Sequence, residues 1–131
     1  MLKPALRALR HCLGLGEDSL TLFEAPAGQR HIDVVLLGVS GDVVAVELKL
    51  GDWKRALSQA SLNQLWADLS YIVIPQSRES ATSACEVARS YGVGVVEVGV
   101  DTASVRVVAV ASRLVDPSRR SRLLELVASG S

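Results

Sequence analysis

The sequence predicts an α/β fold, a three-layer sandwich in which helices cover both sides of a mixed β-sheet. Helical and strand patterns follow one another in the order helix, three strands, helix, strand, helix, two strands, helix. The strand segments are apolar on both faces, and such strands need helices on both sides of their sheet. Short turn signals separate the first three strands, which predicts an antiparallel three-strand meander. Because 131 residues is the size of one domain, we expect a single domain over residues 1–131.

The first predicted helix has Pro4 near its start and ends at Gly14 and Gly16. Proline is common in the first turn of a helix, and glycine commonly follows the last turn. Four leucines recur at helical spacing and form one apolar stripe: Leu2, Leu6, Leu9 and Leu13. Three basic residues fall on another face: Lys3, Arg7 and Arg10. The helix is therefore amphipathic, with one apolar and one basic face.

Three strand segments follow this helix, at residues 19–24, 31–38 and 43–50. The turn between the first two is expected at residues 25–28, whose sequence is Ala-Pro-Ala-Gly. Residues 40–42, whose sequence is Ser-Gly-Asp, supply the turn between the second and the third strand. Both turns are short enough for hairpins, so consecutive strands are expected to pair antiparallel.

The second half of the chain alternates helices and strands. Asp52 is placed as the N-cap of a helix over residues 53–68. Asp116 and Pro117 form the N-cap and first turn of the last helix. The other predicted elements are a strand at 71–74, a helix at 80–91, and strands at 93–100 and 104–111.

The composition excludes several classes of protein. Hydrophobic residues make up 49% of the chain but aromatic residues only 4%, which predicts an ordered domain with an aliphatic core. No apolar run approaches the roughly 20 residues of a membrane helix, and no secretory signal is recognisable. Cys12 and Cys85 lie in predicted helices without CxxC spacing or a histidine cluster. We therefore expect two reduced core thiols in a cytoplasmic protein.

The charges balance overall but are unevenly distributed. The chain has 14 basic and 14 acidic residues. Residues 17–52 contain seven acidic and two basic residues, a net charge of −5, whereas both ends of the chain are net basic. An acidic centre between basic ends suits a cation site beside a polyanion, although ordinary solvated surface charge explains the same pattern.

Three charged residues interrupt otherwise aliphatic strands. Glu47 and Lys49 lie in one strand and project from the same face, because side chains alternate along a strand. Asp33 lies in the preceding strand. If Asp33 pairs with Glu47 or Lys49, all three share a face; if it pairs with Leu48, it points away. Since burying an unpaired charge is costly, the three residues suggest one shared site.

These residue types suit a divalent cation. Two converging carboxylates with a nearby backbone carbonyl are hard oxygen ligands, which favour Mg²⁺ or Mn²⁺. Lys49 would supply a positive charge for a phosphate oxygen or for a forming hydroxide.

Together these residues form a pattern that resembles the PD-(D/E)XK nuclease superfamily. Asp33 is separated by thirteen residues from Glu47-Leu48-Lys49, and a helix bearing Gln59 follows. The order of elements over about residues 1–75 is also similar to the common core of that superfamily, the restriction-endonuclease-like fold.

The resemblance implies hydrolysis of a nucleic-acid phosphodiester by metal-activated water, with Mg²⁺ or Mn²⁺ as the cofactor. It implies that Asp33 and Glu47 bind the metal and that the carbonyl of Leu48 completes the shell. It also implies that Lys49 assists the attacking water and stabilises the charge of the transition state, and that Gln59 supports the site.

The sequence departs from the superfamily pattern at three places. Ile32 stands where proline is usual, and Asn63 stands where one branch has tyrosine. Many members have an acidic residue on the first helix, but none occurs between Leu2 and Leu13. Only Glu17 and Glu24 could replace it.

The candidates also have ordinary structural interpretations. Glu47 and Lys49 can be a surface pair on an exposed sheet face, and Asp33 can be a hydrogen-bonded carboxylate near a turn. Trp53 and Trp66 are expected in the core or in a subunit interface rather than as base-stacking platforms.

We predict a Mg²⁺-dependent endonuclease that hydrolyses DNA in repair, junction resolution or defence. A homodimer is expected, because one compact domain offers little surface for gripping a duplex. DNA contacts are expected from basic residues, although the last three also suit a solvated helix face: Arg7, Arg10, Arg55, Arg119, Arg120 and Arg122. The alternatives are a nucleic-acid-binding or assembly module that has this fold without cleavage, and a structural subunit of a larger complex.

Overall fold

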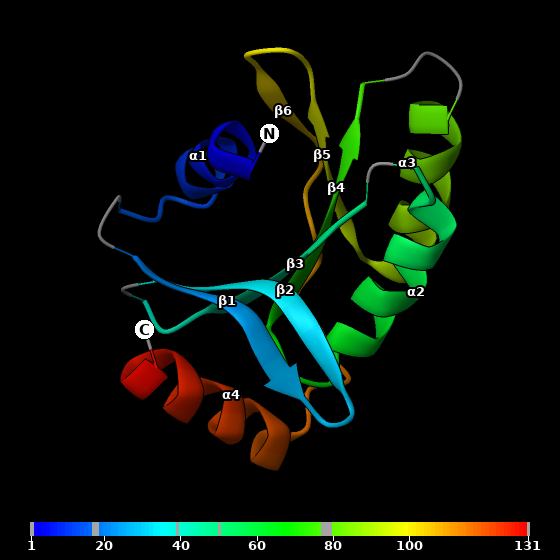
Figure 1. Cartoon of the computed structure of the whole chain (residues 1–131). Helices are drawn as coiled ribbons and strands as arrows, with labels where there is room; N and C mark the ends of the chain where they lie inside the picture. Colours follow the sequence, from blue (N-terminus) through cyan, green and yellow to red (C-terminus); the bar gives the residue numbers. More distant parts are fainter. Residues whose placement is uncertain (1, 17–18, 39, 50, 77–79, 131) are drawn as a thin grey trace.

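The computed structural model describes residues 2–16, 19–38, 40–49, 51–76 and 80–130. These residues form four helices and one six-stranded sheet (Figure 1), which confirms the predicted α/β class and the predicted order of elements. The elements are α1 (Leu2–Cys12), β1 (Leu20–Ala27), β2 (Arg30–Leu37), β3 (Val43–Leu48), α2 (Trp53–Asn63), β4 (Leu69–Pro75), α3 (Ser80–Tyr91), β5 (Gly94–Val98), β6 (Ala103–Val107) and α4 (Pro117–Gly130).

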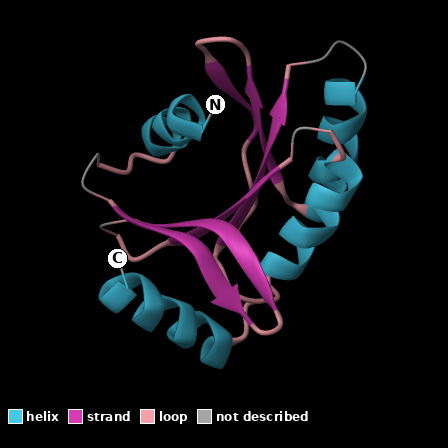
Figure 2. Ribbon diagram, viewed as in Figure 1, coloured by secondary structure: helices cyan, strands magenta, loops and turns pink. Residues whose placement is uncertain are grey.

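The strands lie in the sheet in their sequence order, from β1 at one edge to β6 at the other. β1, β2 and β3 form the predicted antiparallel meander, whereas β3, β4 and β5 are parallel and β6 is antiparallel to β5. The crossover helices α2 and α3 pack on one face of the sheet, and α1 packs on the other (Figure 2). α4 packs against β1 and β2. The sheet is therefore the middle layer of a three-layer sandwich.

Side-chain alternation along β3 divides the core between the two helical layers. Val44 and Val46 are fully buried in the cluster that α1 completes. Val43 and Ala45 are fully buried in the cluster that α4 completes, on the other face. Glu47 lies on the same face as Val43 and Ala45, so its side chain projects toward the layer that contains α2.

β1 continues through residues that the sequence analysis assigned to a turn. Residues 25–27 belong to the strand, and Pro26 pairs with His31. Proline cannot donate a ladder hydrogen bond, but β1 is an edge strand, where a missing N–H faces away from the sheet. The turn is displaced to Gly28, whose φ of 67° is in the left-handed region that glycine tolerates.

α2 ends at Asn63, earlier than the predicted helix over residues 53–68. The backbone N–H groups of Gln64 and Leu65 donate to the carbonyls of Ser61 and Leu62 at 3.2 and 3.1 Å, and this three-residue spacing closes the last turn. Asp68 therefore lies outside the helix, and its Oδ2 accepts a hydrogen bond from the N–H of Val43 at 2.8 Å. This bond holds the start of β4 beside the start of β3.

The remaining boundaries differ from the predicted ones by a few residues. The helix predicted at 80–91 is confirmed as α3. β4 is longer than the predicted 71–74, whereas β5 and β6 are shorter than predicted. β5 ends at Val98 because the N–H of Gly99 donates to the carbonyl of Thr102 at 2.8 Å and closes the turn to β6. β3 ends at Leu48, and residue 50 of its predicted range lies outside the described residues.

Both predicted helix N-caps are confirmed. Oδ1 of Asp52 accepts a hydrogen bond from the N–H of Arg55 at 3.1 Å at the start of α2. Oδ2 of Asp116 accepts one from the N–H of Arg119 at 3.1 Å at the start of α4. Each aspartate satisfies a first-turn N–H that lacks a partner within the helix.

The core is aliphatic, as the composition predicts, with Tyr71 as its largest fully buried side chain. Trp53 and Trp66 are half-buried and pack against the core clusters. Both cysteines are free, but only Cys85 is buried; the prediction of a core thiol is wrong for Cys12, the exposed last residue of α1. In the described part of the chain, no helix combines the length and the apolar character that crossing a bilayer requires.

Candidate functional site

Asp33 and Glu47 lie beside each other on neighbouring strands. The last paired residues of the β2–β3 ladder are Val34 and Val46, so the next residues, Asp33 and Glu47, are level with each other. This is one of the two registers that a shared site requires. The two carboxylates are close enough for their charges to interact. Glu47 projects from the face of the sheet that α2 covers, since it pairs with Ile72, whose side chain packs against α2.

Asp33 is held by the backbone of the strand that carries Glu47. Its Oδ2 accepts a hydrogen bond from the N–H of Leu48 at 2.8 Å. The backbone ladder between β2 and β3 has already ended at Val34, so the carboxylate satisfies an N–H that would otherwise lack a partner on β2. The Asp33 side chain is thereby placed at the backbone between Glu47 and Lys49.

Glu47 is only 1% exposed, which is rare for a carboxylate without a directly paired cation. Its Oε2 accepts a hydrogen bond from Nδ2 of Asn63 at 2.8 Å. Oδ1 of Asn63 in turn accepts a hydrogen bond from Nη2 of Arg30. The carboxylate is thus connected through one amide to a guanidinium on the β1–β2 hairpin.

The pKa of Glu47 is raised from 4.5 to about 7. The main cause is burial, which disfavours the ionised carboxylate, and the negative charge of Asp33 raises the pKa further. The hydrogen bond from Asn63 and the positive charge of Arg30 act in the opposite direction. Burial also lowers the pKa of Arg30, an effect that the charge of Glu47 partly offsets. A carboxylate with a strongly shifted pKa beside a second carboxylate is typical of a functional site.

Lys49 directly follows the end of β3, and Gln59 lies on α2, which covers the face from which Glu47 projects. The N–H of Lys49 donates to the carbonyl of Val73 at 3.2 Å, which extends the parallel ladder to β4 by one residue. Among the described residues, Lys49 forms no ion pair within 4.0 Å with either carboxylate. Gln59 is one turn before Asn63 on α2, and its Oε1 is buried without a hydrogen-bond partner among the described residues. This acceptor is available to a further donor.

Asn63 and Arg30 are not among the site residues predicted from the sequence. Asn63 was detectable in principle, because Gln59 and Asn63 are four residues apart and share a helix face. Arg30 could not be detected from the sequence, since it is 33 residues from Asn63 in the chain. Their contact depends on where the hairpin meets α2.

Many members of the superfamily that the sequence resembles have an acidic residue on the first helix. α1 carries no acidic residue, so this chain has no counterpart there. Glu24 lies between the β1 residues that pair with Val34 and Ile32, which places it level with Asp33, but its side chain is exposed. Its φ of 53° is unusual for a residue other than glycine. Glu17 lies outside the described residues. Among the described residues, no three His, Cys, Asp or Glu side chains gather as a metal-holding group.

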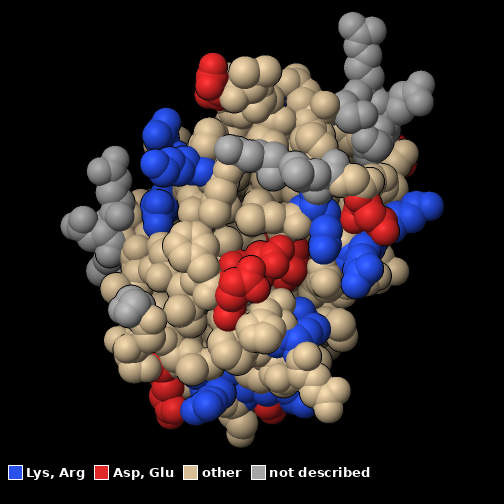
Figure 3. Space-filling model, in the orientation of Figure 1, with Lys and Arg blue, Asp and Glu red and all other residues tan. Residues whose placement is uncertain are grey.

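The predicted DNA-contacting arginines differ in their surroundings. Arg7 and Arg55 are exposed. Arg10 donates to the hydroxyls of Ser19 and Thr21, at 2.9 and 2.7 Å, and thereby joins α1 to β1. The arginines of α4 have ion-pair partners: Arg119 pairs with Asp116, Arg120 with Asp68, and Arg122 with Glu125. Figure 3 shows acidic side chains gathered in the middle of one face of the molecule, with basic side chains around them.

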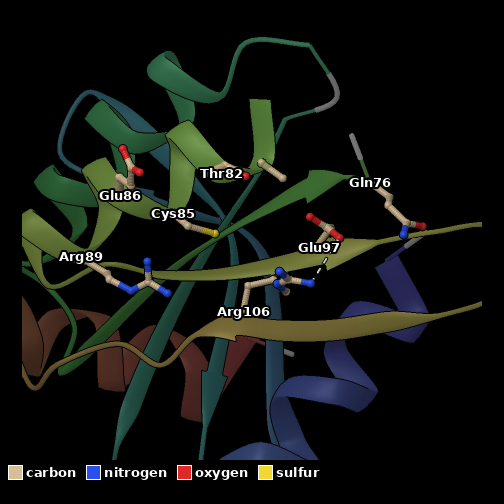
Figure 4. Close-up of a pocket in the computed structure, with 8 residues that line it drawn as sticks. Gln76, Thr82, Cys85, Glu86, Arg89, Glu97 and Arg106 are labelled. Atoms are coloured by element: carbon tan, nitrogen blue, oxygen red, sulfur yellow. Dashed lines mark ion pairs between the residues drawn. The ribbon is translucent and has the colours of Figure 1, made fainter. Parts of the chain in front are cut away.

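A cavity of about 370 Å³ lies between α3 and the β5–β6 edge, and none of the predicted site residues lines it (Figure 4). Arg106 on β6 and Glu97 on β5 form an ion pair at 4.0 Å along the strand side of the cavity. Burial raises the pKa of the Cys85 thiol, against the influence of Arg89 and Arg106. Two arginines and two glutamates line the cavity, so its lining has no net charge.

The sequence matches no protein-family profile and no curated protein. Among solved structures, a protein of unknown function from Silicibacter pomeroyi aligns with 96% of this chain and 84% of its own, at 19% sequence identity and a TM-score of 0.65. A repair endonuclease from Pyrococcus abyssi aligns with 74% of this chain, at 18% identity and a TM-score of 0.50.

The chain shares its fold with a repair endonuclease. It spans 46% of the length of that enzyme. At these identities the similarity concerns the arrangement of helices and strands. The chemistry of the site depends on Asp33, Glu47 and their neighbours.

Proposed function

We propose that this protein is a Mg²⁺-dependent endonuclease of the PD-(D/E)XK type that hydrolyses phosphodiester bonds of DNA. The observation that carries the proposal is the pair of adjacent carboxylates, Asp33 and Glu47, in a fold shared with a repair endonuclease. Burial and like-charge repulsion both oppose the ionised form of Glu47, and a cation bound beside it would favour that form.

The donor set of the site fits Mg²⁺ or Mn²⁺. Asp33 and Glu47 would hold the cation. The backbone carbonyl of Leu48 would complete the protein ligands. Each carboxylate has two oxygens, so the hydrogen bonds to Oδ2 and Oε2 leave capacity for a cation. Mg²⁺ commonly uses one or two carboxylates and keeps several waters, which suits a site of two acids. A bound cation would polarise a phosphate oxygen and favour the ionisation of water.

Lys49 would place a positive charge beside the reacting phosphate. Its ammonium would stabilise the additional negative charge of the transition state and favour loss of a proton from the attacking water. The unpartnered Oε1 of Gln59 would accept a hydrogen bond from water or from substrate at the same site.

DNA binding would use local basic surfaces, because the net charge of the chain is zero. Arg7 on α1 and Arg55 on α2 are exposed and available for phosphate contacts. A homodimer would present two sites to one duplex. Sedimentation at the concentrations used for cleavage measures this directly, and an active monomer would contradict the dimer.

The alternative function is a nucleic-acid-binding or assembly module that does not cleave. The absence of an acidic residue from α1 favours it, because the site then has two carboxylates where many nucleases of this type have three.

Calorimetric titration of Mg²⁺ and Mn²⁺ into the wild type and Glu47→Ala tests the proposal, together with cleavage of duplex, junction and single-stranded DNA. We expect metal binding and cleavage by the wild type and loss of both in the variant. Wild-type protein that binds DNA but neither binds metal nor cleaves any of the three substrates would establish the binding module instead.

A further inference from the structure

The Glu47 carboxylate is the end of a buried hydrogen-bonded chain that includes two further side chains. Asn63 is 0% exposed and donates from Nδ2 to Oε2 of Glu47 at 2.8 Å. Arg30 donates from Nη2 to Oδ1 of the same amide. The chain joins three elements, since Glu47 is on β3, Asn63 is the last residue of α2, and Arg30 is the first residue of β2.

The contact with Arg30 determines which side of the Asn63 amide faces Glu47. An asparagine amide donates through nitrogen and accepts through oxygen. Arginine can only donate, so it requires the oxygen, and the nitrogen is left for the carboxylate. If the amide were reversed, its oxygen would face the carboxylate and its nitrogen would face the guanidinium, and both hydrogen bonds would be lost. Arg30 therefore fixes the orientation of the group that holds Glu47.

We propose that Asn63 and Arg30 are positioning residues that orient the Glu47 carboxylate for a divalent cation, with Arg30 acting through Asn63. The inference rests on the proposed function, in which Glu47 is a metal ligand. Ligating carboxylates are generally oriented by such hydrogen-bonding partners, whose loss typically weakens metal affinity by about 10- to 100-fold.

The charge of Arg30 and its hydrogen bond have opposite effects on cation binding. A positive charge near the site repels a cation, so removal of a charge that acted only through space would tighten metal binding. Removal of a group that orients Glu47 would weaken metal binding. The sign of the change therefore distinguishes a positioning role from a purely electrostatic one.

The experiment is a calorimetric titration of Mn²⁺ into the wild type, Arg30→Gln, Arg30→Lys, Asn63→Ala and Glu47→Gln. We expect Mn²⁺ affinity to fall by about 10- to 100-fold in Arg30→Gln and Asn63→Ala. The glutamine amide ends two bonds short of the Nη2 position and is neutral, whereas Arg30→Lys keeps the charge and a donor one bond short of that position and should lie closer to the wild type. The matched controls are Gln29→Ala, beside Arg30, and Ser58→Ala, on α2; both side chains are exposed, and both variants should bind as the wild type does.

A double-mutant cycle tests whether Arg30 acts through Asn63. In the Asn63→Ala background, Arg30→Gln should change Mn²⁺ affinity by less than about threefold, because the connection is already broken. Full additivity of the two effects would show that Arg30 acts independently. If Asn63→Ala does not fold, as judged by thermal unfolding, the comparison of Arg30→Gln with Arg30→Lys decides the question.

Failure of this inference is distinguishable from failure of the proposed function. A wild type that does not bind Mn²⁺ contradicts the proposed function itself. Binding by the wild type and not by Glu47→Gln, with unchanged or tighter binding by Arg30→Gln, overturns only the positioning role. A raised KM for DNA in Arg30→Gln at saturating metal, with kcat unchanged, would also overturn it, because Arg30 would then contact the substrate directly.

Discussion

Asp33 accepts a hydrogen bond from the backbone N–H of Leu48 at 2.8 Å, so one acidic side chain is held by the backbone that carries the other. The bond lies where the β2–β3 ladder ends at Val34 and Val46. It therefore satisfies a backbone donor and, at the same time, holds the Asp33 carboxylate next to Glu47. Stability and the geometry of the site depend on the same contact.

Substitution of Asp33 should separate these two effects. Asp33→Ala leaves the N–H of Leu48 without its partner, and we expect a loss of about 1–3 kcal/mol in the free energy of unfolding. Asp33→Asn keeps an acceptor oxygen, so its free energy of unfolding should fall by less than half as much as that of Asp33→Ala. Both variants should lose Mg²⁺ binding, since each removes the negative charge. Urea unfolding and calorimetry measure the two effects, with the exposed Asp101→Asn as control; Mg²⁺ binding by Asp33→Asn would contradict the assignment of a ligand role.

The raised pKa of Glu47 predicts that stability falls with increasing pH in metal-free buffer. The folded protein holds the proton up to about pH 7, whereas the unfolded chain releases it near pH 4.5. Between these values the folded state binds more protons, so the free energy of unfolding decreases as pH rises and levels off above about pH 7. Between pH 5 and pH 8, the free energy of unfolding should decrease by on the order of 2 kcal/mol less in Glu47→Gln than in the wild type.

Urea unfolding with a chelator present measures this difference. The exposed Glu86→Gln on α3 is the matched control and should follow the wild type. Parallel pH profiles for the wild type and Glu47→Gln would show that Glu47 ionises normally in the folded protein.

Lys49→Ala should reduce the cleavage rate without preventing metal or DNA binding. The ammonium acts on the attacking water and on transition-state charge, so we expect kcat to fall by about two to four powers of ten. Mg²⁺ affinity should stay the same or increase, because a neighbouring positive charge is removed. Lys54→Ala removes the same charge from the first turn of α2 and serves as the control. A wild-type rate for Lys49→Ala would leave Lys49 with only a structural role.

DNA affinity should depend steeply on salt despite the zero net charge. Each phosphate contact releases condensed counterions, so the logarithm of the affinity falls linearly with the logarithm of salt concentration. Arg7→Gln and Arg55→Gln should each reduce the slope by about 1. Arg113→Gln, an exposed arginine outside the predicted contact set, should leave the slope unchanged. Fluorescence anisotropy with labelled duplex gives these slopes, and no salt dependence between low and physiological ionic strength would argue against nucleic acid as the partner.

Features that depend on local pattern were predictable from the order of the amino acids. The strand period of two places Glu47 and Lys49 on one face, and the short turns predict the meander. The capping chemistry of Asp52 and Asp116 marks the starts of α2 and α4 correctly. These features were predictable because each depends on residues within a few positions of one another.

Features that depend on distant segments follow from the packing of the folded chain. Placing Asp33 level with Glu47, rather than with Leu48, is a choice between strand registers, and a shift of one residue would reverse the face of Asp33. The contact between Arg30 and Asn63 joins a hairpin to the end of a helix. Such contacts form where packing of the sheet against its helices brings the segments together, and neither helical nor strand periodicity encodes that position.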